Sequence, residues 1–441
     1  MAKENQSTGE AEFFVTSAIV NISPKVPIFI GCGPPQKILD LRSSELEANI
    51  LLVRASDASP VILFVSLDAL YVGPRLRQDI EAELGRELRD VEIIFSASHS
   101  HFAPMLDDTK PKLGKVVEEH YVRVLSDLIA GIRITLGAES SKLVKISHHR
   151  YRTRAPMYRR RVVPLALKNG KLEFFRSQWL PHPFRRLRVF SDIIKFTSVE
   201  GIEACIWIMP CHPVSYIGPN KISADYVGVA RTALRESVFA KPKTPVVFIQ
   251  GASGDLRPSS IGLRKLDSVK SLAVNLLYGP SFIPFNKDGW LKWVSGLTTE
   301  FMGAIREASP IEKAPFEGNL VTAQRHALRL NDYFEFAYSR ERFLTIQSLQ
   351  LAGVHFLGVS AEVSWELRSL LAKALDDPEL VVGGCIEDNF GYLSSSGQAR
   401  WGGYEVEGFL EPFSLIRRAC DVESELFQQI LLVCSEAESS D

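Results

Sequence analysis

The feature that most constrains the fold of this chain is a pair of apolar, strand-like runs that each lead into a histidine-bearing segment. Residues 91–95 lead into Ser-Ala-Ser-His-Ser-His-Phe-Ala-Pro at 96–104, and residues 204–208 lead into Met-Pro-Cys-His-Pro at 209–213. Imidazole is the commonest protein ligand for metals, and a catalytic zinc keeps one position open for water. Because strand ends are rigid, they bring such ligands together from distant parts of a sequence. The two segments therefore indicate a metal centre.

Strand-like and helix-like segments alternate along the chain. Short apolar runs predict strands at 50–53, 61–65, 246–249, 343–351 and 354–359. Amphipathic periodicity predicts helices at 73–88, 117–136, 226–238 and 364–375. Strands interleaved with helices favour an α/β fold, in which a mixed β-sheet core is flanked by helices and ligands bind on the loops at strand ends.

Length and composition are those of an ordinary globular chain. It has 441 residues, 46% hydrophobic and 23% charged, and a formal net charge of −1. A chain so close to neutrality has no overall attraction for nucleic acid, so we expect no such partner. We expect one domain over residues 1–441. Residues 262–315 turn basic and aromatic, which is typical of an inserted or peripheral region.

We expect neither a secretion signal nor a transmembrane helix in this sequence. No uninterrupted apolar stretch reaches the length of about 18 residues that a membrane helix needs, which leaves only peripheral membrane contact open. No apolar signal segment follows Met1, and the six cysteines form no C-x-x-C pair, a pattern typical of reduced thiols. These features predict a cytoplasmic protein and leave its oligomeric state open.

The two histidine segments each allow a second interpretation. In Ser98-His99-Ser100-His101 the imidazoles are two residues apart and share one face of a strand, so both can point at one metal or one substrate. Such pairs also serve as hydrogen-bonded turn residues. His212 precedes a proline, and a rigid X-Pro turn also holds histidines that bind nothing.

Three carboxylates are candidates beside these histidines. Glu362 lies where an apolar strand meets a helix. It is either a metal ligand or a carboxylate that stabilises the helix N-terminus through the helix dipole. Asp68 ends a buried strand and either orients a histidine or caps a loop. Asp255 lies in the small-residue segment 251–258, where it could orient a ligand. That segment is neither a Walker loop nor a Rossmann fingerprint.

Two further groups of residues are less specific. Arginines crowd residues 150–161, and we expect a solvated face from which one arginine turns toward an anionic or carbonyl substrate, in preference to a nucleic-acid site. Aromatic residues at 278–293 either line an acyl site or touch a membrane interface, or they simply pack. We favour packing for them.

The segments that carry chemistry also follow a known order. They are Ser98-His99-Ser100-His101-Phe102-Ala103-Pro104, Thr153-Arg154-Ala155-Pro156, Cys211-His212-Pro213, Ile222-Ser223-Ala224-Asp225-Tyr226, 250–258, Ser360-Ala361-Glu362-Val363-Ser364 and Gly391-Tyr392-Leu393-Ser394-Ser395, followed by Tyr404-Glu405. Together they resemble the catalytic domain of the neutral (non-lysosomal) ceramidase family. Its motifs T-H-T-H-S-G-P, N-R-S-P, T-H-P, I-S-x-D-x, Q-x-x-x-G-D-V-S-P, P-G-E-F-T and Y-I-T-T, then Y-E, occur in this order.

This resemblance implies a zinc site. Its ligands would be the first histidine of H-x-H, the histidine of the H-P motif, the glutamate and the tyrosine. In this chain those residues are His99, His212, Glu362 and Tyr392. The resemblance also implies the fold of the catalytic domain, and we expect this chain to lack the immunoglobulin-like C-terminal domain of the full-length ceramidases.

The resemblance assigns further roles around the zinc. His101 and Arg154 would contact the substrate near the scissile amide, Asp255 would belong to the catalytic set, and Tyr404 would contact the substrate. The family's serine in G-D-V-S-P is replaced by Arg257, so no serine nucleophile is expected. We expect Arg257 instead to bind a carboxylate or phosphate on the substrate.

The sequence therefore predicts a zinc-dependent hydrolase that cleaves an N-acyl amide bond with a metal-activated water. Its substrate would be a small-molecule or lipid N-acyl compound such as ceramide. The alternatives are a zinc esterase or another metallohydrolase on the same scaffold, and a catalytically silent binding homologue that keeps the fold.

Overall fold

The computed structural model describes most of the chain. The described residues are 12–32, 37–39, 44–56, 60–137, 141–168, 171–182, 188–216, 218, 221–311, 321–336, 341–417 and 421–439. Of the six cysteines, Cys420 lies outside these residues, and the other five form no disulfide among them.

An eight-stranded mixed sheet forms the centre of the molecule. Its strands run in the order β13 (Val246–Gln250), β12 (Gly201–Met209), β11 (Phe190–Ser198), β7 (Lys142–Arg152), β1 (Phe13–Asn21), β4 (Glu47–Ala55), β5 (Val61–Leu67) and β6 (Val91–Ala97). The outer pairs β12–β13 and β5–β6 are parallel, and the pairs between them are antiparallel. Both histidine segments therefore follow strands of one sheet, on opposite halves of it.

A second sheet packs against one face of the first. It has the order β17 (Val321–Arg329), β19 (Phe343–Leu351), β20 (Val354–Val359) and β22 (Val381–Gly383). Backbone bridges at Ser96–Ile386 and Gly251–Gly383 join the two sheets near the ends of β6 and β13. The chain segments that follow β6, β13 and β20 therefore converge at the junction of the sheets.

Side chains alternate between the two faces along each buried strand, which explains why the first sheet is covered on both faces. Leu51, Phe64 and Ile94 belong to the apolar core shared with the second sheet. Their chain neighbours Leu63 and Phe95 belong to the core shared with helices on the opposite face. Because successive strand side chains point to opposite faces, wholly apolar strands need cover on both sides.

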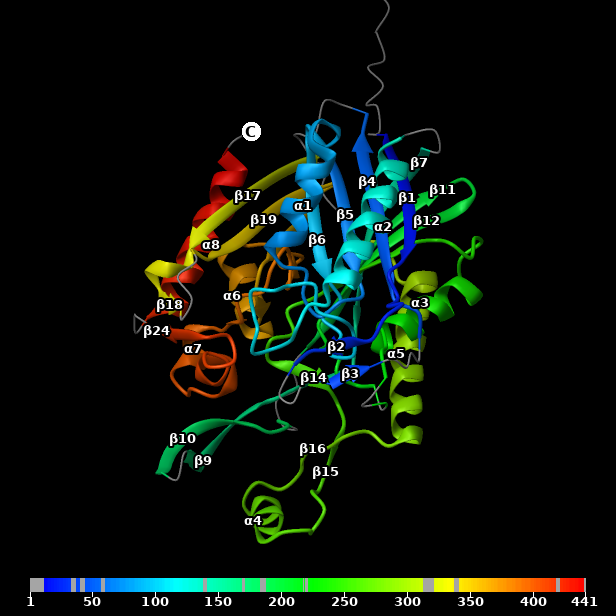
Figure 1. Ribbon diagram of the computed structural model, residues 1–441. Coiled ribbons are helices and arrows are strands. Elements are labelled where there is room, and N and C mark those ends of the chain that lie inside the picture. Colours follow the sequence, from blue (N-terminus) through cyan, green and yellow to red (C-terminus); the bar gives the residue numbers. More distant parts are fainter. Residues whose placement is uncertain are drawn as a thin grey trace, which may run out of the picture.

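Helices form the two outer layers. The outer face of the large sheet is covered by α1 (Pro74–Leu84), α2 (Glu118–Leu136), α3 (Asp225–Ser237) and α5 (Lys287–Glu307). The outer face of the small sheet is covered by α6 (Trp365–Ala374) and α8 (Val422–Ser439). Figure 1 shows α1 and α2 in front of the large sheet at the centre of the view, with α6 and α8 at the left near β17 and β19. The layers are thus helix, sheet, sheet, helix.

Short elements complete the fold. They are β2 (Ile28–Ile30), β3 (Lys37–Leu39), β8 (Pro156–Tyr158), β14 (Leu256–Pro258), β18 (Phe334–Phe336), β21 (Glu362–Val363), β23 (Tyr392–Leu393), β24 (Leu415–Arg417), α7 (Ser396–Ala399), 3-10 turns at Gly85–Leu88 and Leu330–Asp332, and a π-helical turn at Tyr404–Gly408. Several of them, β14, β21 and β23 above all, lie around the junction of the sheets.

Two segments extend from the lower end of the molecule in Figure 1. One is the hairpin β9 (Arg160–Lys168) and β10 (Lys171–Trp179), and the other is α4 (Val269–Tyr278) between β15 (Ile261–Gly262) and β16 (Ser281–Phe282). The range 262–315 includes the α4 segment but not the hairpin, and it also includes α5, which packs on α3 in the body of the protein. The assignment of one domain stays a prediction.

The α/β class with a mixed sheet flanked by helices is confirmed by this architecture. The predicted pair of strands at 343–351 and 354–359 is confirmed as β19 and β20, but a second sheet built around that pair was not predicted. Among the described residues, no helix has the length and hydropathy needed to cross a bilayer.

Candidate metal centre

His99 lies two residues beyond β6 in a left-handed backbone conformation, with φ of 60°. Its backbone N–H donates to the carbonyl of Ala69 at 2.9 Å, and its Nδ1 lies 3.2 Å from the carbonyl of Leu70. A carbonyl oxygen only accepts, so Nδ1 carries the proton. In the neutral imidazole this leaves Nε2 as an unprotonated donor atom that can bind a metal.

His212 is held in the same way from the other half of the sheet. It follows β12, and its Nδ1 donates to the carbonyl of Leu256 at 2.9 Å. The loop after it is fixed by Asp225, whose carboxylate accepts from the backbone N–H of Ser215 at 2.7 Å. Nε2 of His212 then lies 2.7 Å from Oε2 of Glu362.

Glu362 reaches the histidines from the small sheet. It forms β21, which pairs in parallel with β23, and its backbone N–H donates to the carbonyl of Gly391 at 2.8 Å. The loop after β13 passes so close that a Cβ on Gly254 would lie 2.5 Å from the Glu362 carbonyl oxygen. Only glycine fits there, so the small-residue segment 251–258 allows this close approach.

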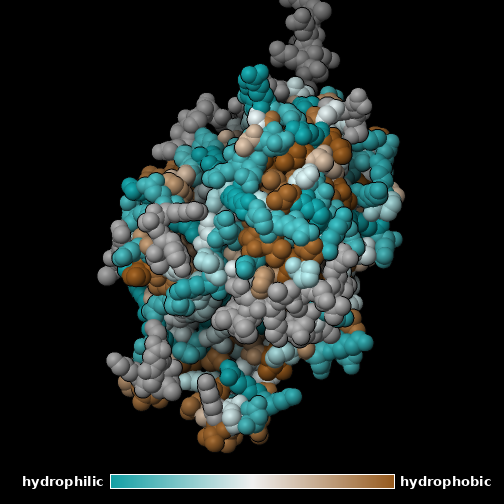
Figure 2. Space-filling view, viewed as in Figure 1, coloured by the Kyte–Doolittle hydropathy of each residue, from teal (hydrophilic) through white to brown (hydrophobic). Residues whose placement is uncertain are grey.

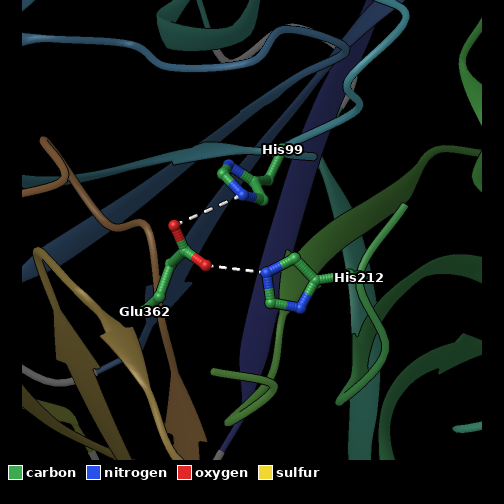
Figure 3. A group of neighbouring side chains, drawn as sticks. All are labelled: His99, His212 and Glu362. Carbon is green, nitrogen blue, oxygen red and sulfur yellow. Dashed lines mark hydrogen bonds and ion pairs between the residues drawn. The ribbon is translucent and has the colours of Figure 1, made fainter. Parts of the chain in front are cut away.

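These three side chains form one buried cluster, drawn in Figure 3. The ligand atoms of His99, His212 and Glu362 lie within 4.8 Å of one another. Nε2 of His99 is buried without a hydrogen-bond partner, 3.5 Å from Oε1 of Glu362. If both imidazoles are neutral, two nitrogen lone pairs face a carboxylate, and acceptors in that arrangement need a cation among them. The donor set therefore fits a metal ion.

The electrostatics of the cluster favour the deprotonated ligands that a metal binds. Burial lowers the pKa of His99 to about 4, more than the nearby carboxylate raises it. Burial alone would raise the pKa of Glu362, but His99, His212 and a hydrogen bond from Tyr392 hold that pKa well below its usual range. At neutral pH His99 is thus neutral and Glu362 is ionised.

His101 lies beside the cluster. Its ring centroid is 5.0 Å from that of His99 and 6.4 Å from that of His212. Its Nε2 is buried without a hydrogen-bond partner, and burial lowers the pKa of His101 well below the usual value. His101 is therefore a neutral imidazole next to the candidate metal ligands.

Tyr392 joins the cluster through Glu362. It forms β23 beside the glutamate, its hydroxyl hydrogen bonds with the Glu362 carboxylate, and its ring stacks near His212 with centroids 6.4 Å apart. Burial and the charge of Glu362 raise the pKa of Tyr392 well above its usual value. The arrangement places the phenol next to the predicted metal position.

The arginine at this phenol is Arg159, and Arg154 lies elsewhere. Arg154 is exposed, and its backbone N–H donates to Glu300 at 3.3 Å. The guanidinium of Arg159 is 5.3 Å from the Tyr392 ring centroid, hydrogen bonds with that tyrosine and pairs with Glu405 at 2.7 Å. Among the described contacts Arg154 has none with the cluster, so its predicted role at the substrate stays a prediction.

The prediction of a solvated arginine face is wrong for part of the segment. Arg159 and Arg160 are buried and share the carboxylate of Glu405. Because Glu405 lies far along the chain, the local sequence held no sign of this counter-charge.

The predicted carboxylates Asp68 and Asp255 have other partners. Asp68 pairs with Arg231 of α3 at 2.5 Å. Asp255 accepts from the backbone N–H of Trp365 at 2.7 Å and from Nε2 of Gln398 at 2.7 Å. Asp255 thus caps the first turn of α6, just beyond Glu362, and acts on the site by positioning its backbone.

Arg257 and Tyr404, the predicted substrate-binding residues, lie on one side of the cluster. Tyr404 contacts Tyr392 edge to face, with centroids 5.5 Å apart, and stacks on Trp179 at 5.6 Å. The Arg257 guanidinium lies 5.2 Å from the Trp179 ring centroid. A row of rings therefore leads from the cluster to Arg257.

Asn389 is a further residue of the candidate site, which the sequence did not indicate. Its side-chain amide donates to Oε1 of Glu362 at 3.2 Å and accepts from the Gly391 backbone N–H at 2.8 Å. No motif was assigned to it, and only its place two residues before Gly391-Tyr392 could have drawn attention.

Comparison with known proteins bears on the fold. No protein-family model and no curated protein matches the sequence of this chain. A structure of neutral ceramidase from Pseudomonas aeruginosa matches with a TM-score of 0.68 at 12% identity, covering 96% of this chain and 74% of that chain. A ceramidase complexed with C2 matches with a TM-score of 0.68 at 11% identity, with coverage of 96% and 74%. The chain therefore has the neutral ceramidase fold, as its motifs predicted.

Proposed function

We propose that this chain is a zinc-dependent hydrolase that cleaves the amide bond of an N-acyl compound, of the class that includes ceramide. The observation that carries the proposal is the convergence of two imidazole Nε2 atoms on one buried carboxylate, at His99, His212 and Glu362. Two histidines and a glutamate are a ligand set of catalytic zinc sites that leaves a position for water. The ceramidase fold supports the choice of an acyl amide.

The chain supplies the ligands and the groups around them. Zinc bound there would lower the pKa of a water molecule and polarise the acyl carbonyl. Nε2 of the neutral His101 would take a proton from the attacking water and give it to the leaving amine. Tyr392, held by Arg159, would fix the Glu362 carboxylate or join it as a further ligand.

Metal analysis and substrate assays test this proposal together. We expect one zinc per chain by mass spectrometry, and release of fatty acid from a short-chain ceramide or an N-acyl amino acid that is lost with chelator and restored by zinc. His99→Ala and Glu362→Gln should lose both zinc and activity. His326→Ala, on the partly exposed strand β17, is the matched control and should keep both.

Three outcomes would contradict the amide hydrolase. Bound zinc with cleavage of esters but not amides would indicate an esterase. Bound zinc without hydrolysis would indicate a silent homologue. Full activity of His99→Ala would place the reaction elsewhere in the molecule.

A further inference from the structure

Arg257 is a largely buried cation without an anionic partner among the described residues. Burial, and next to it the like charge of Arg159, lowers the pKa of Arg257 to about 10, so it remains protonated at neutral pH. Its Nε is buried and makes no hydrogen bond. The guanidinium lies instead over two rings, at 5.2 Å from Trp179 and 4.7 Å from Phe282.

Other buried arginines in the described chain have partners. Arg231 pairs with Asp68, and Arg160 pairs with Glu405 at 2.6 Å. Arg368, whose pKa burial likewise lowers to about 10, donates to the carbonyl of Leu380 at 2.5 Å. Burying a charge without a partner costs several kcal/mol in general, so a partly buried guanidinium whose buried Nε lacks an acceptor indicates an anionic ligand.

The position of Arg257 connects it to the metal centre. The carbonyl of its chain neighbour Leu256 accepts from Nδ1 of His212. Trp179, which contacts the guanidinium, stacks on Tyr404, and Tyr404 contacts Tyr392. Arg257 therefore lies at the end of the ring row that begins at the cluster.

We propose that Arg257 binds an anionic group, a carboxylate or a phosphate, carried by the N-acyl substrate. The proposal rests on the proposed function and narrows its substrate class to acidic N-acyl amides, such as N-acyl amino acids or phosphorylated N-acyl amines. Guanidinium N–H groups lie in the plane of the group and bind either anion in pairs. Rings over the guanidinium restrict it to that in-plane contact.

The test compares three substrates with the same acyl chain. N-lauroylglycine carries a carboxylate, N-lauroylethanolamine phosphate carries a phosphate, and N-lauroylethanolamine is neutral. For Arg257→Met, which keeps an apolar chain between the rings, kcat/KM should fall about tenfold or more for the preferred acidic substrate. It should stay within about twofold for the neutral one, because no charged contact is lost there.

Binding is measured alongside, so that the two proposals fail separately. Titration calorimetry of the zinc-loaded protein should show tighter binding of an acidic compound than of the neutral one, and Arg257→Met should remove the difference. If no compound is hydrolysed but this difference holds, only the hydrolase proposal fails. An equal loss for acidic and neutral compounds, or none, would refute the role of Arg257.

Two controls keep the result interpretable. Arg152→Met removes an exposed arginine at the end of β7 and should change neither measurement. Arg257→Lys keeps the charge, so it should retain part of the preference for acidic compounds, and it serves as the test if the methionine variant does not fold.

A second inference comes from the surface of the lower extension. Of the 24 large hydrophobic side chains exposed in the described residues, 13 lie on the β9–β10 hairpin and the segment around α4. The most exposed ones, which we call the apolar tip, are Leu172, Phe174, Phe175, Leu263, Leu266, Val269, Leu276 and Leu277. Figure 2 shows this brown surface at the end of the molecule where Figure 1 places the two segments.

The two segments form one connected surface. Tyr278, at the end of α4, donates from its hydroxyl to the carbonyl of Leu165 in β9 at 3.0 Å, and its own carbonyl accepts from Arg161. Residues 161–179 and 261–282 contain seven basic and two acidic residues, a charge of +5, in a chain whose net charge is −1. The apolar tip thus stands in a basic part of the protein.

We infer that the apolar tip inserts into the surface of a membrane that contains anionic lipid. Exposed apolar side chains beside basic ones are the pattern of proteins that bind at a membrane interface. Both segments also contact Arg257 where they join the body of the protein, through Trp179 at the end of β10 and Phe282 in β16. A lipid-bound tip would therefore place the ring row close to an amphiphilic substrate.

Vesicle sedimentation tests this surface. We expect the zinc-loaded protein to sediment with phosphatidylcholine vesicles that contain phosphatidylglycerol, and much less with phosphatidylcholine alone or at high salt. The double variants Phe174→Ser with Phe175→Ser, and Leu276→Ser with Leu277→Ser, should lose binding. Val199→Ser, a fully exposed residue of the β11–β12 turn, should keep it.

Binding that is equal in all variants would refute the inference. Analytical ultracentrifugation of the same variants tests the alternative, in which a second copy of the chain covers the apolar tip. If they break a dimer and leave vesicle binding unchanged, the tip contacts a second copy of the chain.

Discussion

At the scale of residues, the candidate site depends on main-chain carbonyls that set the histidine tautomers. The carbonyl of Leu70 accepts a hydrogen bond from Nδ1–H of His99, and the carbonyl of Leu256 accepts one from Nδ1–H of His212. Each contact turns Nε2 toward Glu362 before any metal binds. Such contacts both orient an imidazole ligand and increase its basicity, so the protein supplies a preformed site.

Asn389 should tune the affinity of this site for metal. Its amide holds Oε1 of Glu362, and its carbonyl oxygen holds the backbone of Gly391, to which Glu362 also bonds. Asn389→Ala removes both contacts, and such outer contacts are typically worth 10–100-fold in metal affinity. We expect zinc affinity, measured by competition with a chelating dye, to fall by about tenfold or more.

A matched variant distinguishes this effect from a general loss of side-chain amides. Asn275→Ala on α4 removes an amide that, within the described residues, bonds with the backbone of Arg264, and zinc affinity should not change. An Asn389→Ala protein with the affinity of the unsubstituted chain would show that Glu362 needs no support from this amide.

The sequence could predict the ligands but not these partners. His99, His212 and Glu362 were predicted because motifs of known order contain them, and the fold brings them together. Backbone carbonyls leave no mark in a sequence. The contact of Arg159 with Tyr392 was not predicted for a similar reason. Only the folded chain shows that Arg159, and not Arg154, lies against this tyrosine.

At the scale of elements, the start of α6 positions the Glu362 carboxylate of the candidate site. Asp255 accepts from the N–H of Trp365, and Ser364 accepts from the N–H of Leu367 at 3.1 Å. Both cap a helix that begins three residues after Glu362. Buried helix N–H groups without acceptors are costly, so the caps fix the exit of β21.

Asp255→Ala should therefore destabilise the protein and loosen the site. We expect the free energy of unfolding to fall by about 2 kcal/mol, from the lost cap and the unpaired buried N–H. Urea unfolding of the zinc-free protein measures it, and zinc affinity should fall as well. Asp255→Asn keeps an acceptor for Trp365 and should lose less. Equal stability of the alanine variant would show that Ser364 suffices as the cap.

Helix α2 should make stability depend on pH through His120. This histidine is buried, and Arg123 donates to its Nδ1 at 3.3 Å. Burial, and next to it the charge of Arg123, lowers the pKa of His120 to about 4. The unfolded chain, with a pKa near 6.5, then binds more protons between pH 6.5 and 4. Stability is complete above this window and falls by about 3 kcal/mol as pH falls through it.

The measurement is urea unfolding across this pH range. His120→Gln should show a shallower loss of stability on acidification, while His326→Gln on β17 should keep the slope of the unsubstituted chain. Parallel curves for all three proteins would mean that other groups cause the acid sensitivity.

The elements themselves differed in how well the sequence predicted them. Residues 117–136 showed helical periodicity and form α2, and the apolar run 61–65 lies within β5. Helix α2 packs along one apolar face, and strand β5 is buried on both faces, so each has a clear pattern in the sequence. The β9–β10 hairpin was not predicted, because its exposed apolar residues follow no pattern set by the core. In the second sheet the pair β19–β20 was predicted, but the addition of β17 and β22 was not, because those pairings join segments that are farther apart in the sequence.

At the scale of the whole molecule, the candidate centre ties the two sheets together. His99 and His212 follow strands of the large sheet, and Glu362 follows β20 of the small one. The sheets already share an apolar core that includes Phe64, Ile94 and Phe356. A metal would add a second connection at the edge of that core, made from parts of the chain that are far apart in sequence.

Removal of the metal should therefore lower the stability of the whole domain in a single transition. A ligand that binds only the folded state adds about 2.7 kcal/mol when its concentration is 100 times its Kd. We expect chelation to lower the thermal midpoint by about 3 °C, and zinc to restore it in proportion to the logarithm of its concentration. The transition should stay single, because the shared core still joins the sheets without metal. His99→Ala should unfold at one midpoint at every zinc concentration, since one ligand is gone. If zinc instead raised the midpoint of this variant as much as that of the unsubstituted chain, the stabilising ion would be bound at another place, and the link between the two sheets would be the apolar core alone.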